Sequence, residues 1–567
     1  MNNTKTWEQY RAGLTYQSSM GFPQACAMHV RFKEGDQWPA PTERTKNLPR
    51  PVFNIIDFIV RAKRSSVLDQ PASIAYRPTE EALDELETQI MVDGAKHYTD
   101  YAHQLWKAMD MDKLNNEAVD DAATNGTGIW HFYWDAEVKG GGITPYFGEL
   151  RGETIDQLNL FVSNPQQKDV QKQEYIIISK RMPVEDVKRM AKAAGLSATK
   201  IAEINSDKDS ADETYDSARK EVDGEGKITL LTKYYRKDGE VVFDRCTKCV
   251  EIIKERPLTP AGSQYRIKKY PVAVMNWKYR KKCFYGIGEV EGLIPNQKAI
   301  NFNIAMELYA VQQTGFPKVI SKPNAIRQPI TNEPGEHIID YYGNGNGISY
   351  LNPPAFNGAG TALADKIVEL TRVITGSTEV ATGEAMGANM AASAIIALQN
   401  QAKTPVNELQ RHFWWALEDT GRIWEEFFKT YYSMPRSIAV EDIDSESGIE
   451  ASQFTGTDYA GMDFSLQVDV GASSQYSAVL AQATLDKFLD AGHITPDQYI
   501  ELSDPNVVPF KSRYKRMMEQ QMQEMPMAAP GMEAGVEGYQ PAHGIGGVQL
   551  PDIPKAPDAM SAFKGVI

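Results

Sequence analysis

The sequence predicts an α+β protein, and three observations support this fold class. Residues 1 to about 135 have a mostly helical pattern, including a long charged stretch at residues 80–101 with apolar residues near helical spacing. Residues 136–285 consist mainly of short segments rich in β-branched and aromatic residues, with one helical insert. After residue 285 come long helical segments that are separated by a stretch rich in proline and glycine.

The composition narrows the class of protein. With 567 residues, the chain has room for about three or four domains. A net charge of −15 argues against a protein that attracts nucleic acid by its overall charge, but it does not exclude one past which DNA slides without being held. Four scattered cysteines predict a reducing compartment and no disulfide framework. We expect no signal peptide and no membrane span, and hence a soluble protein made in the cytoplasm.

The first half of the chain provides the first set of expected elements. Helices are predicted at residues 55–64, 80–101 and 112–123, and the glycines of residues 126–128 end this pattern. The KDG sequence at residues 237–239 predicts a hairpin turn, and the polar residues 205–226 predict a loop. One helix is predicted at residues 183–194. Strands are expected at residues 129–134, 175–179, 228–235, 240–244, 250–253 and 272–277. The last two of these strands are expected to continue the sheet that the hairpin around residues 237–239 begins.

The segment from about residue 285 to 430 is the most informative part of the chain. A long helix is predicted at residues 292–314, with apolar residues such as Phe302, Met306 and Val311 on more than one side. Such a helix either lies in the core of a monomer or packs against identical helices in a ring. Residues 316–354 hold six prolines, so short strands at 318–321, 337–339 and 348–351 are expected there, which a neighbouring subunit can complete.

The rest of the chain continues the alternation of helices and strands. Helices are predicted at residues 361–375 and 394–401, and the small, nearly uncharged residues 381–389 indicate either a plain interdomain loop or a mobile segment. A long aromatic helix is predicted at 406–432, strands at 438–440 and 464–470, and further helices at 476–491, from 495 and at 510–524. The tail after residue 525 is rich in Met, Pro, Ala and Gly, which predicts disorder.

The motifs of enzymes and metal sites are missing from the sequence. No Walker A motif occurs, which argues against an ATPase, and neither a nucleophile elbow nor an HExxH motif is found. The pair Cys246 and Cys249 lacks two further ligands with ordered spacing, so two reduced thiols at a turn are expected rather than a zinc site. His412, together with Glu408 and Asp419, is expected on a solvated or interface face of the aromatic helix. We therefore expect no catalytic site, no cofactor and no metal.

Several short sequences, in their order and spacing, resemble the portal proteins, or head-to-tail connectors, of short-tailed bacteriophages. The resemblance covers roughly residues 30–505. Its carriers are GDQWP at residues 35–39, RPVFN at 50–54, YGIGE at 285–289 with Gln297 and Asn301, TGSTE at 375–379 with Gly383, and ITPDQY at 494–499.

The resemblance implies a portal fold that assembles as a ring of twelve subunits at one vertex of the capsid. Its expected parts are a helical and β wing at residues 1–287, stem helices at 288–315 and 357–377, a small α/β clip at 316–356, a tunnel loop or kinked helix at 378–405, the long helix with a return to wing strands at 406–473, a helical crown at 474–525, and a disordered tail at 526–567.

The resemblance also implies a function and partners. DNA passes through the channel during packaging and ejection and is retained in between, without sequence specificity; the partners are terminase, capsid protein and tail adaptor proteins. Lys318, Lys322 and Arg327 are expected in the clip, in contact with terminase, adaptors or DNA. Met386, Asn389 and Lys403 are expected near the channel. The alternatives are another virion structural or adaptor protein, or an enzyme whose site is unrecognised.

Overall fold

The computed structural model divides into two units, residues 1–509 and 510–567, and all described residues belong to the first unit. The structure describes residues 4–70, 72–79, 85–141, 145–207, 226–315, 318–327, 329, 339–341, 347–351, 359–376, 404–441, 449–470, 485–489 and 491–503. The expected helices at 394–401 and 510–524, the strand at 337–339 except its last residue, most of the loop at 205–226 and the tail lie outside these residues.

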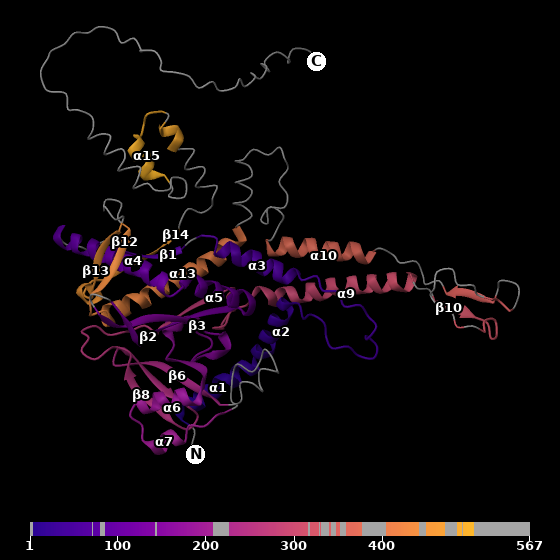
Figure 1. Cartoon of the computed structure of the whole chain (residues 1–567), viewed down its shortest axis with the longest axis horizontal. Coiled ribbons are helices and arrows are strands. Elements are labelled where there is room, and N and C mark those ends of the chain that lie inside the picture. Colours follow the sequence, from indigo (N-terminus) through magenta and orange to yellow (C-terminus); the bar gives the residue numbers. More distant parts are fainter. Residues whose placement is uncertain are drawn as a thin grey trace, which may run out of the picture. The chain divides into compact units, whose positions relative to one another are not determined.

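Helices form the longest elements in the described part of the chain (Figure 1). Those predicted around residues 55, 112, 292, 361, 406 and 496 are confirmed. The α-helices of the described residues are α1 (Lys5–Ser19), α2 (Phe22–Glu34), α3 (Ile55–Val67), α4 (Glu85–Ala108), α5 (Met111–Asn125), α6 (Val184–Ala193), α7 (Ala198–Ala202), α9 (Glu289–Gly315), α10 (Ala359–Thr375), α13 (Thr404–Tyr431) and α15 (Pro496–Leu502).

The described strands form two larger sheets and three separate strand pairs. One sheet has the order β3-β2-β9, the other β4-β5-β6-β7-β8, and the pairs are β1-β14, β10-β11 and β12-β13. The strands are β1 (Ala72–Pro78), β2 (Thr127–Gly140), β3 (Tyr146–Thr154), β4 (Leu160–Val162), β5 (Tyr175–Pro183), β6 (Lys227–Lys237), β7 (Glu240–Cys246), β8 (Glu251–Pro257), β9 (Val272–Asn276), β10 (Lys318–Ser321), β11 (Ile348–Leu351), β12 (Arg436–Glu441), β13 (Ile449–Phe454) and β14 (Phe464–Val470).

The hairpin between β6 and β7 is the one that the sequence predicts. Lys237 pairs with Glu240, and the two turn residues Asp238 and Gly239 both have positive φ angles, 52° and 81°. Such a turn follows the twist of the flanking strands. The expectation that residues 272–277 continue this sheet is wrong, because β9 pairs antiparallel with β2 instead. β9 is buried on both sides and packs against α13, which the strand's apolar sequence alone does not reveal.

The core is organised around α13. Its buried side chains, among them Phe413, Trp424, Phe427 and Phe428, recur at intervals of three and four residues, as expected for a helix with an apolar stripe. The strand pair β1-β14 joins residues 72–78 to 464–470 and also packs against α13. The last third of the chain thus completes a core that the first third begins.

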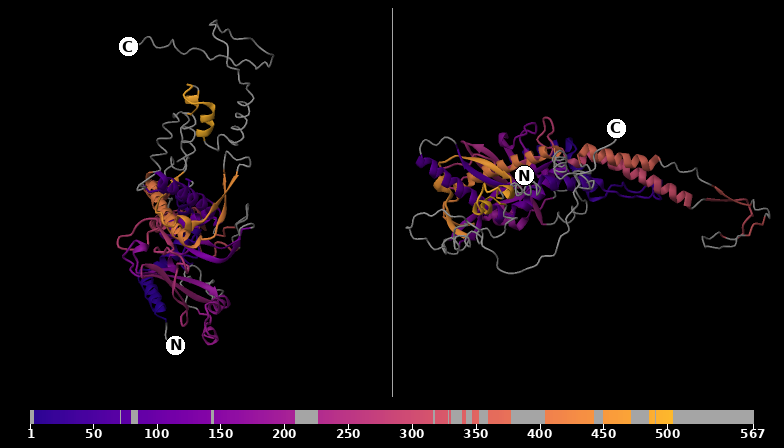
Figure 2. Two further views of the ribbon diagram at one scale, coloured as in Figure 1. Left: turned by 90° about the vertical axis from the view of Figure 1, so that its left-hand side faces the viewer. Right: turned by 90° about the horizontal axis from the view of Figure 1, so that it is seen from above.

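Helices α9 and α10 lie side by side and antiparallel in both figures (Figures 1 and 2). The chain leaves α9 at Gly315 and enters β10 at Lys318, and β11 precedes α10 in the same way. Lys318 pairs with Leu351 and Ser321 with Ile348, so the two short strands pair within one chain. The expected order of helix, short strands and helix is therefore confirmed.

Glycines allow α9 to start in close contact with α5 and β2. A Cβ atom on Gly288 would collide with the carbonyl group of Thr124, and one on Gly286 would collide with the carbonyl oxygen of Gly126. The amide of Gly286 also donates to the hydroxyl of Thr127 at 2.9 Å. Since backbone atoms cannot move aside as a flexible side chain can, only glycine fits at these two positions.

We predict that Gly288→Ala lowers the free energy of unfolding by about 1–3 kcal/mol, because the added methyl group overpacks a backbone contact. Gly292→Ala is the matched control, since a Cβ there meets no atom within 4 Å. Gly292 lies in the first turn of α9, four positions after Gly288, and its substitution is expected to raise stability by about 0.5–1 kcal/mol. Thermal and urea unfolding measure both; equal effects of the two substitutions would contradict this account of the contact.

Candidate functional site: the helix pair and its anchor

The first half of α9 is fixed to the body by a buried side-chain amide. The Gln297 side chain is 1% exposed. Its Oε1 accepts from the backbone N–H groups of Ile55 at 3.0 Å and Ile56 at 3.4 Å, and its Nε2 donates to the carbonyl of Phe53 at 2.6 Å. The first N–H groups of a helix have no partner within that helix, so Gln297 satisfies the donor of Ile56 and shares that of Ile55, which also donates to the carbonyl of Phe53 at 2.9 Å.

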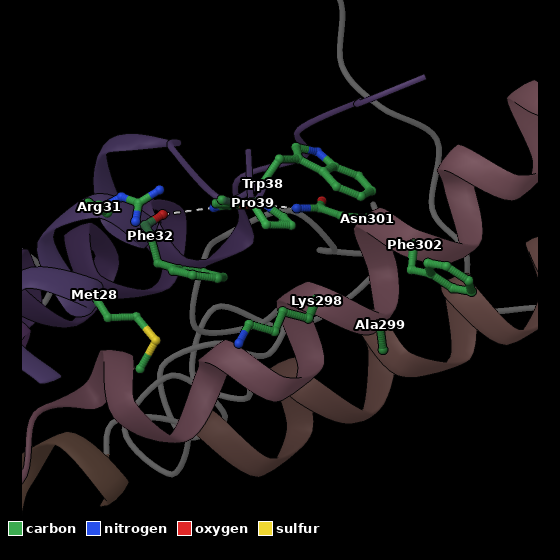
Figure 3. A pocket seen from close by; sticks show the side chains of 10 residues that line it. Met28, Arg31, Phe32, Trp38, Pro39, Lys298, Ala299, Asn301 and Phe302 are labelled. Atoms are coloured by element: carbon green, nitrogen blue, oxygen red, sulfur yellow. Dashed lines mark hydrogen bonds between the residues drawn. The ribbon is translucent and has the colours of Figure 1, made fainter. Parts of the chain in front are cut away.

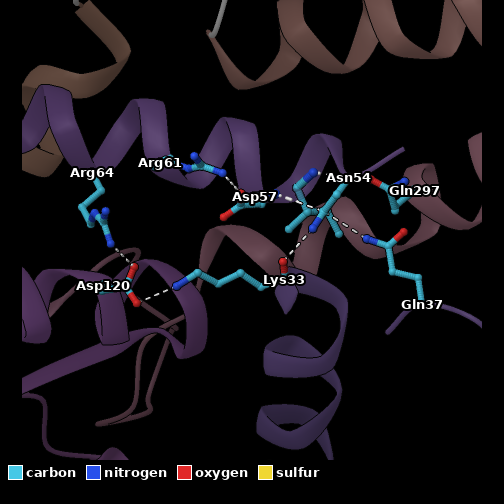
Figure 4. Close-up of polar contacts among 9 residues, drawn as sticks. Lys33, Gln37, Asn54, Asp57, Arg61, Arg64, Asp120 and Gln297 are labelled. Carbon is cyan, nitrogen blue, oxygen red and sulfur yellow. Dashed lines mark hydrogen bonds and ion pairs between the residues drawn. The ribbon is translucent and has the colours of Figure 1, made fainter. Parts of the chain in front are cut away.

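The network continues from Gln297 to three further side-chain amides, of which Gln37 and Asn54 are labelled in Figure 4. Gln297 Nε2 also donates to Asn301 Oδ1 at 3.0 Å, and Asn301 Nδ2 donates to Gln37 Oε1 at 2.6 Å. Gln37 Nε2 donates to Asn54 Oδ1 at 3.0 Å, and Asn54 Nδ2 donates to the carbonyl of Lys33 at 2.7 Å. Three sequences that carry the family resemblance, GDQWP, RPVFN and the segment after YGIGE, therefore meet in one network.

The Glu289 carboxylate forms a second anchor at the start of α9. It is 3% exposed and binds Lys63 Nζ of α3 at 2.7 Å, Lys278 Nζ at 2.9 Å and Trp277 Nε1 at 3.0 Å. Burial alone would raise the pKa of Glu289, but the two lysines outweigh it and the pKa is lowered. Removing either partner of a buried ion pair leaves a charge without compensation, so this contact fixes α9 against α3.

An acidic cluster on α5 lies next to this anchor. Asp120 accepts from Lys33 of α2 at 2.5 Å and from Arg64 of α3 at 2.7 Å, so one carboxylate joins three helices (Figure 4). Burial, followed by the nearby carboxylates of Asp156 and Asp120, raises the pKa of Asp121 to about 7. This carboxyl group therefore changes its charge near neutral pH.

The second half of α9 and much of α10 expose apolar side chains. On α9 the exposed side chains include Phe302, Met306, Leu308, Tyr309 and Val311, and Val311 is 59% exposed. At 100° per residue these positions cover several sides of the helix. On α10 the exposed apolar side chains are Leu363, Leu370, Val373 and Ile374, and Ile374 is 79% exposed. Several large apolar side chains exposed on one helix pair are more typical of a surface that contacts another molecule than of a free surface.

A groove of about 630 Å³ opens between α2 and α9 (Figure 3). Its walls include Met28 and Phe32 of α2, Trp38, and Lys298 and Phe302 of α9. Trp38 is held in place by a hydrogen bond from its Nε1 to the carbonyl of Pro51 at 2.9 Å. Lys298 Nζ lies 5.3 Å from the centre of the Phe32 ring. The groove is thus mostly apolar, with two cations in its lining, Lys298 and Arg31, the second of which is paired with Asp36 at 2.7 Å.

The structure describes only some of the residues expected to contact DNA or partners. Lys322 and Arg327 are exposed after β10, and the guanidinium of Arg327 lies 4.8 Å from the centre of the Tyr341 ring. Lys318 begins β10. Met386, Asn389 and Lys403 lie outside the described residues.

The expectation that Glu408, His412 and Asp419 lie on a solvated or interface face is wrong for His412. Glu408 is exposed, but His412 is 6% exposed, and its Nδ1 lies 3.3 Å from the carbonyl oxygen of Trp277. Tyr279 packs edge-on against the imidazole ring, so aromatic packing buries this histidine. Burial raises the pKa of Asp419 on the same helix.

The two cysteines with CxxC spacing are free thiols at the end of β7 and in the turn that follows. Cys246 is buried, and its Sγ accepts from the Thr4 hydroxyl at 3.5 Å. Within the described residues, no group of three or more His, Cys, Asp and Glu side chains could hold a metal ion.

Comparison with known proteins gives the family to which the chain belongs. A family model described as phage P22-like portal protein matches residues 8–537. The chain belongs to this family. Phage P22-like portal proteins are structural rather than catalytic, form homo-oligomeric assemblies with the capsid, and are components of a capsid vertex. The short-tailed-phage resemblance that the sequence suggests is therefore confirmed.

Two further findings accompany this membership. A search of curated proteins found no match to this chain. None of the helices in the described part of the chain combines the length and the apolar character needed to cross a bilayer.

Sequence analysis did not assign roles to Gln37, Asn54, Gln297 and Asn301 beyond the resemblance. Their side chains meet only in the folded chain, since Gln37 and Asn301 are 264 positions apart. The available signal was two amides spaced four residues apart on a predicted helix, which places them on one face.

We predict that Gln297→Leu lowers the free energy of unfolding by about 2–4 kcal/mol, because it removes the side-chain acceptor of the Ile55 and Ile56 N–H groups and the side-chain donor to the Phe53 carbonyl. Amide hydrogen exchange at Ile55 and Ile56 should speed up as well. The matched control is Gln312→Leu at an exposed position of α9. Unchanged exchange at both amides in Gln297→Leu would rule out the proposed anchoring role.

The raised pKa of Asp121 predicts a pH dependence of stability. Between about pH 4 and 7 the folded chain binds more protons at this carboxyl than the unfolded chain, so stability falls as pH rises through this window. Asp121→Asn should remove this pH dependence. At pH 8 its free energy of unfolding should be about 1–2 kcal/mol higher than that of the wild type. At pH 4 the two should agree. Urea titrations at both pH values measure this, with the exposed Glu34→Gln as control; a lower stability of Asp121→Asn at pH 8 would be inconsistent with the cause given.

Proposed function

We propose that twelve copies of this chain form a ring around an axial channel at one capsid vertex. Double-stranded DNA enters the capsid through this channel during packaging, is retained there, and leaves by the same path at ejection. The outer end of the ring attaches the tail. Membership of the portal family supports this function.

The single observation that carries the proposal is the apolar surface of α9 and α10. A helix that exposes Phe302, Met306, Leu308 and Val311 on several sides is not covered by its own chain. Burial of apolar area is worth about 25 cal/mol per Å², so such side chains favour association. Copies of the same helix pair, arranged around an axis, cover them on both flanks.

The parts of the proposed ring follow the chain. Residues 1–287, with strands from 406–473, form the wing; 288–315 and 357–377 form the stem; and 316–356 form the clip. In the clip, Lys318, Lys322 and Arg327 face terminase during packaging and tail adaptors later. Residues 378–405, with Met386, Asn389 and Lys403, border the channel. Residues 474–525 form the crown, and residues 526–567 are the C-terminal tail of the chain.

The proposed mechanism is passive, and terminase supplies the motor. The chain has no Walker A sequence, and its net charge of −15 limits how tightly a channel lined by it holds phosphates. Weak, unspecific contact lets DNA slide in either direction. The anchors at Glu289 and Gln297 keep α9 in a fixed orientation while DNA moves.

The test is the native mass of the purified full-length protein together with negative-stain images. We expect a species near twelve times 63.3 kDa with an axial hole. The apolar surface of α9 and α10 would be buried between its subunits. A monomer at every salt and protein concentration, with no ring in virions, would refute the proposed function.

A further inference from the structure

The two outer edges of the helix pair are chemically different. The contact between the helices is marked by Asn296 Nδ2, which donates to Thr371 Oγ1 at 3.0 Å. Two residues correspond to about 200° of rotation, so Lys298 lies on the edge of α9 that faces away from α10. By the same geometry, Glu369 lies on the edge of α10 that faces away from α9. One edge therefore carries a cation and the other a carboxylate.

These two charges also lie at the same height along the pair. The helices are antiparallel, so two residues forward along α9 correspond to two residues backward along α10. Lys298 is therefore level with Glu369. Both side chains are exposed, and no ion pair is found for either within the described residues.

Apolar side chains accompany each charge. Phe302, 54% exposed, lies one turn after Lys298 and borders the groove between α2 and α9. Val373, 60% exposed, lies one turn after Glu369, and the exposed Leu370 directly follows Glu369 in the chain. Lys366 lies about one turn before Glu369, level with Asn301. Thus the α9 edge offers a mostly apolar groove. Its cation without an ion pair among the described residues is Lys298, since Arg31 is paired with Asp36. The α10 edge offers an apolar ridge with Glu369, preceded one turn earlier by the exposed Asp365 and Lys366.

We propose that the groove is a docking site for a second copy of this chain, whose α10 edge enters it. Lys298 of one copy then faces Glu369 of the next, and Leu370 and Val373 pack near Phe302. Because each copy offers both edges, the contact is heterologous and repeats until the ring closes. This inference rests on the proposed ring and adds which surfaces meet and in which register.

The test is a charge exchange in the full-length protein. Lys298→Glu and Glu369→Lys each place like charges face to face, so each should raise the protein concentration needed for half-assembly by about tenfold or more. The double variant restores opposite charges and should assemble within a few-fold of the wild type. Native mass spectrometry at a series of concentrations measures the assembled fraction, and circular dichroism confirms that each variant folds.

Matched controls change the same charges elsewhere. Lys192→Glu on α6 and Glu203→Lys after α7 are exposed and should assemble like the wild type. If the wild type forms no ring, the proposed function itself fails. If the wild type forms a ring, and the single variants assemble normally or the double variant is not restored, this interface is wrong while the ring remains.

Discussion

The structure depends on a difference between the two halves of α9, one of which is attached to the body of the chain while the other is exposed. Its first half has one buried face, which is held by Glu289 and Gln297, while its second half exposes apolar side chains on several sides. Apolar packing alone would tolerate small rotations of a helix. Gln297 accepts hydrogen bonds from the first N–H groups of α3 and donates one to the Phe53 carbonyl. These bonds allow only one rotation, because each needs its own direction and distance.

A fixed rotation of α9 has consequences for assembly. It determines which edge of the helix pair carries Lys298 and which carries Glu369. In a ring of identical copies, an error in this orientation would be repeated at every interface. The buried polar groups thus provide orientation more than stability, in agreement with the use of polar core residues to specify register in other helical assemblies.

The sequence predicts local features well where their cause is local. The turn at Asp238 and Gly239, the cap of α15 by Thr495 and the stripe of α13 follow from turn chemistry, capping and helical spacing. Pairings over long distances are not predicted: β1 finds β14 almost 400 positions away, and β9 joins β2 rather than β8. The burial of His412 is not predicted and the contacts of Gln297 are not foreseen for a related reason, since the tertiary partners of a polar helix residue are unknown from its sequence alone. The expected roles of Met386, Asn389 and Lys403 stay predictions.

The most direct test of the central claim is an electron cryo-microscopy reconstruction of the assembled protein. The account predicts that α9 and α10 of all copies surround the axis, with Phe302 and Leu370 buried between neighbouring copies. Helix pairs that point into solvent away from their neighbours, with Phe302 as exposed as in the single chain, would contradict it.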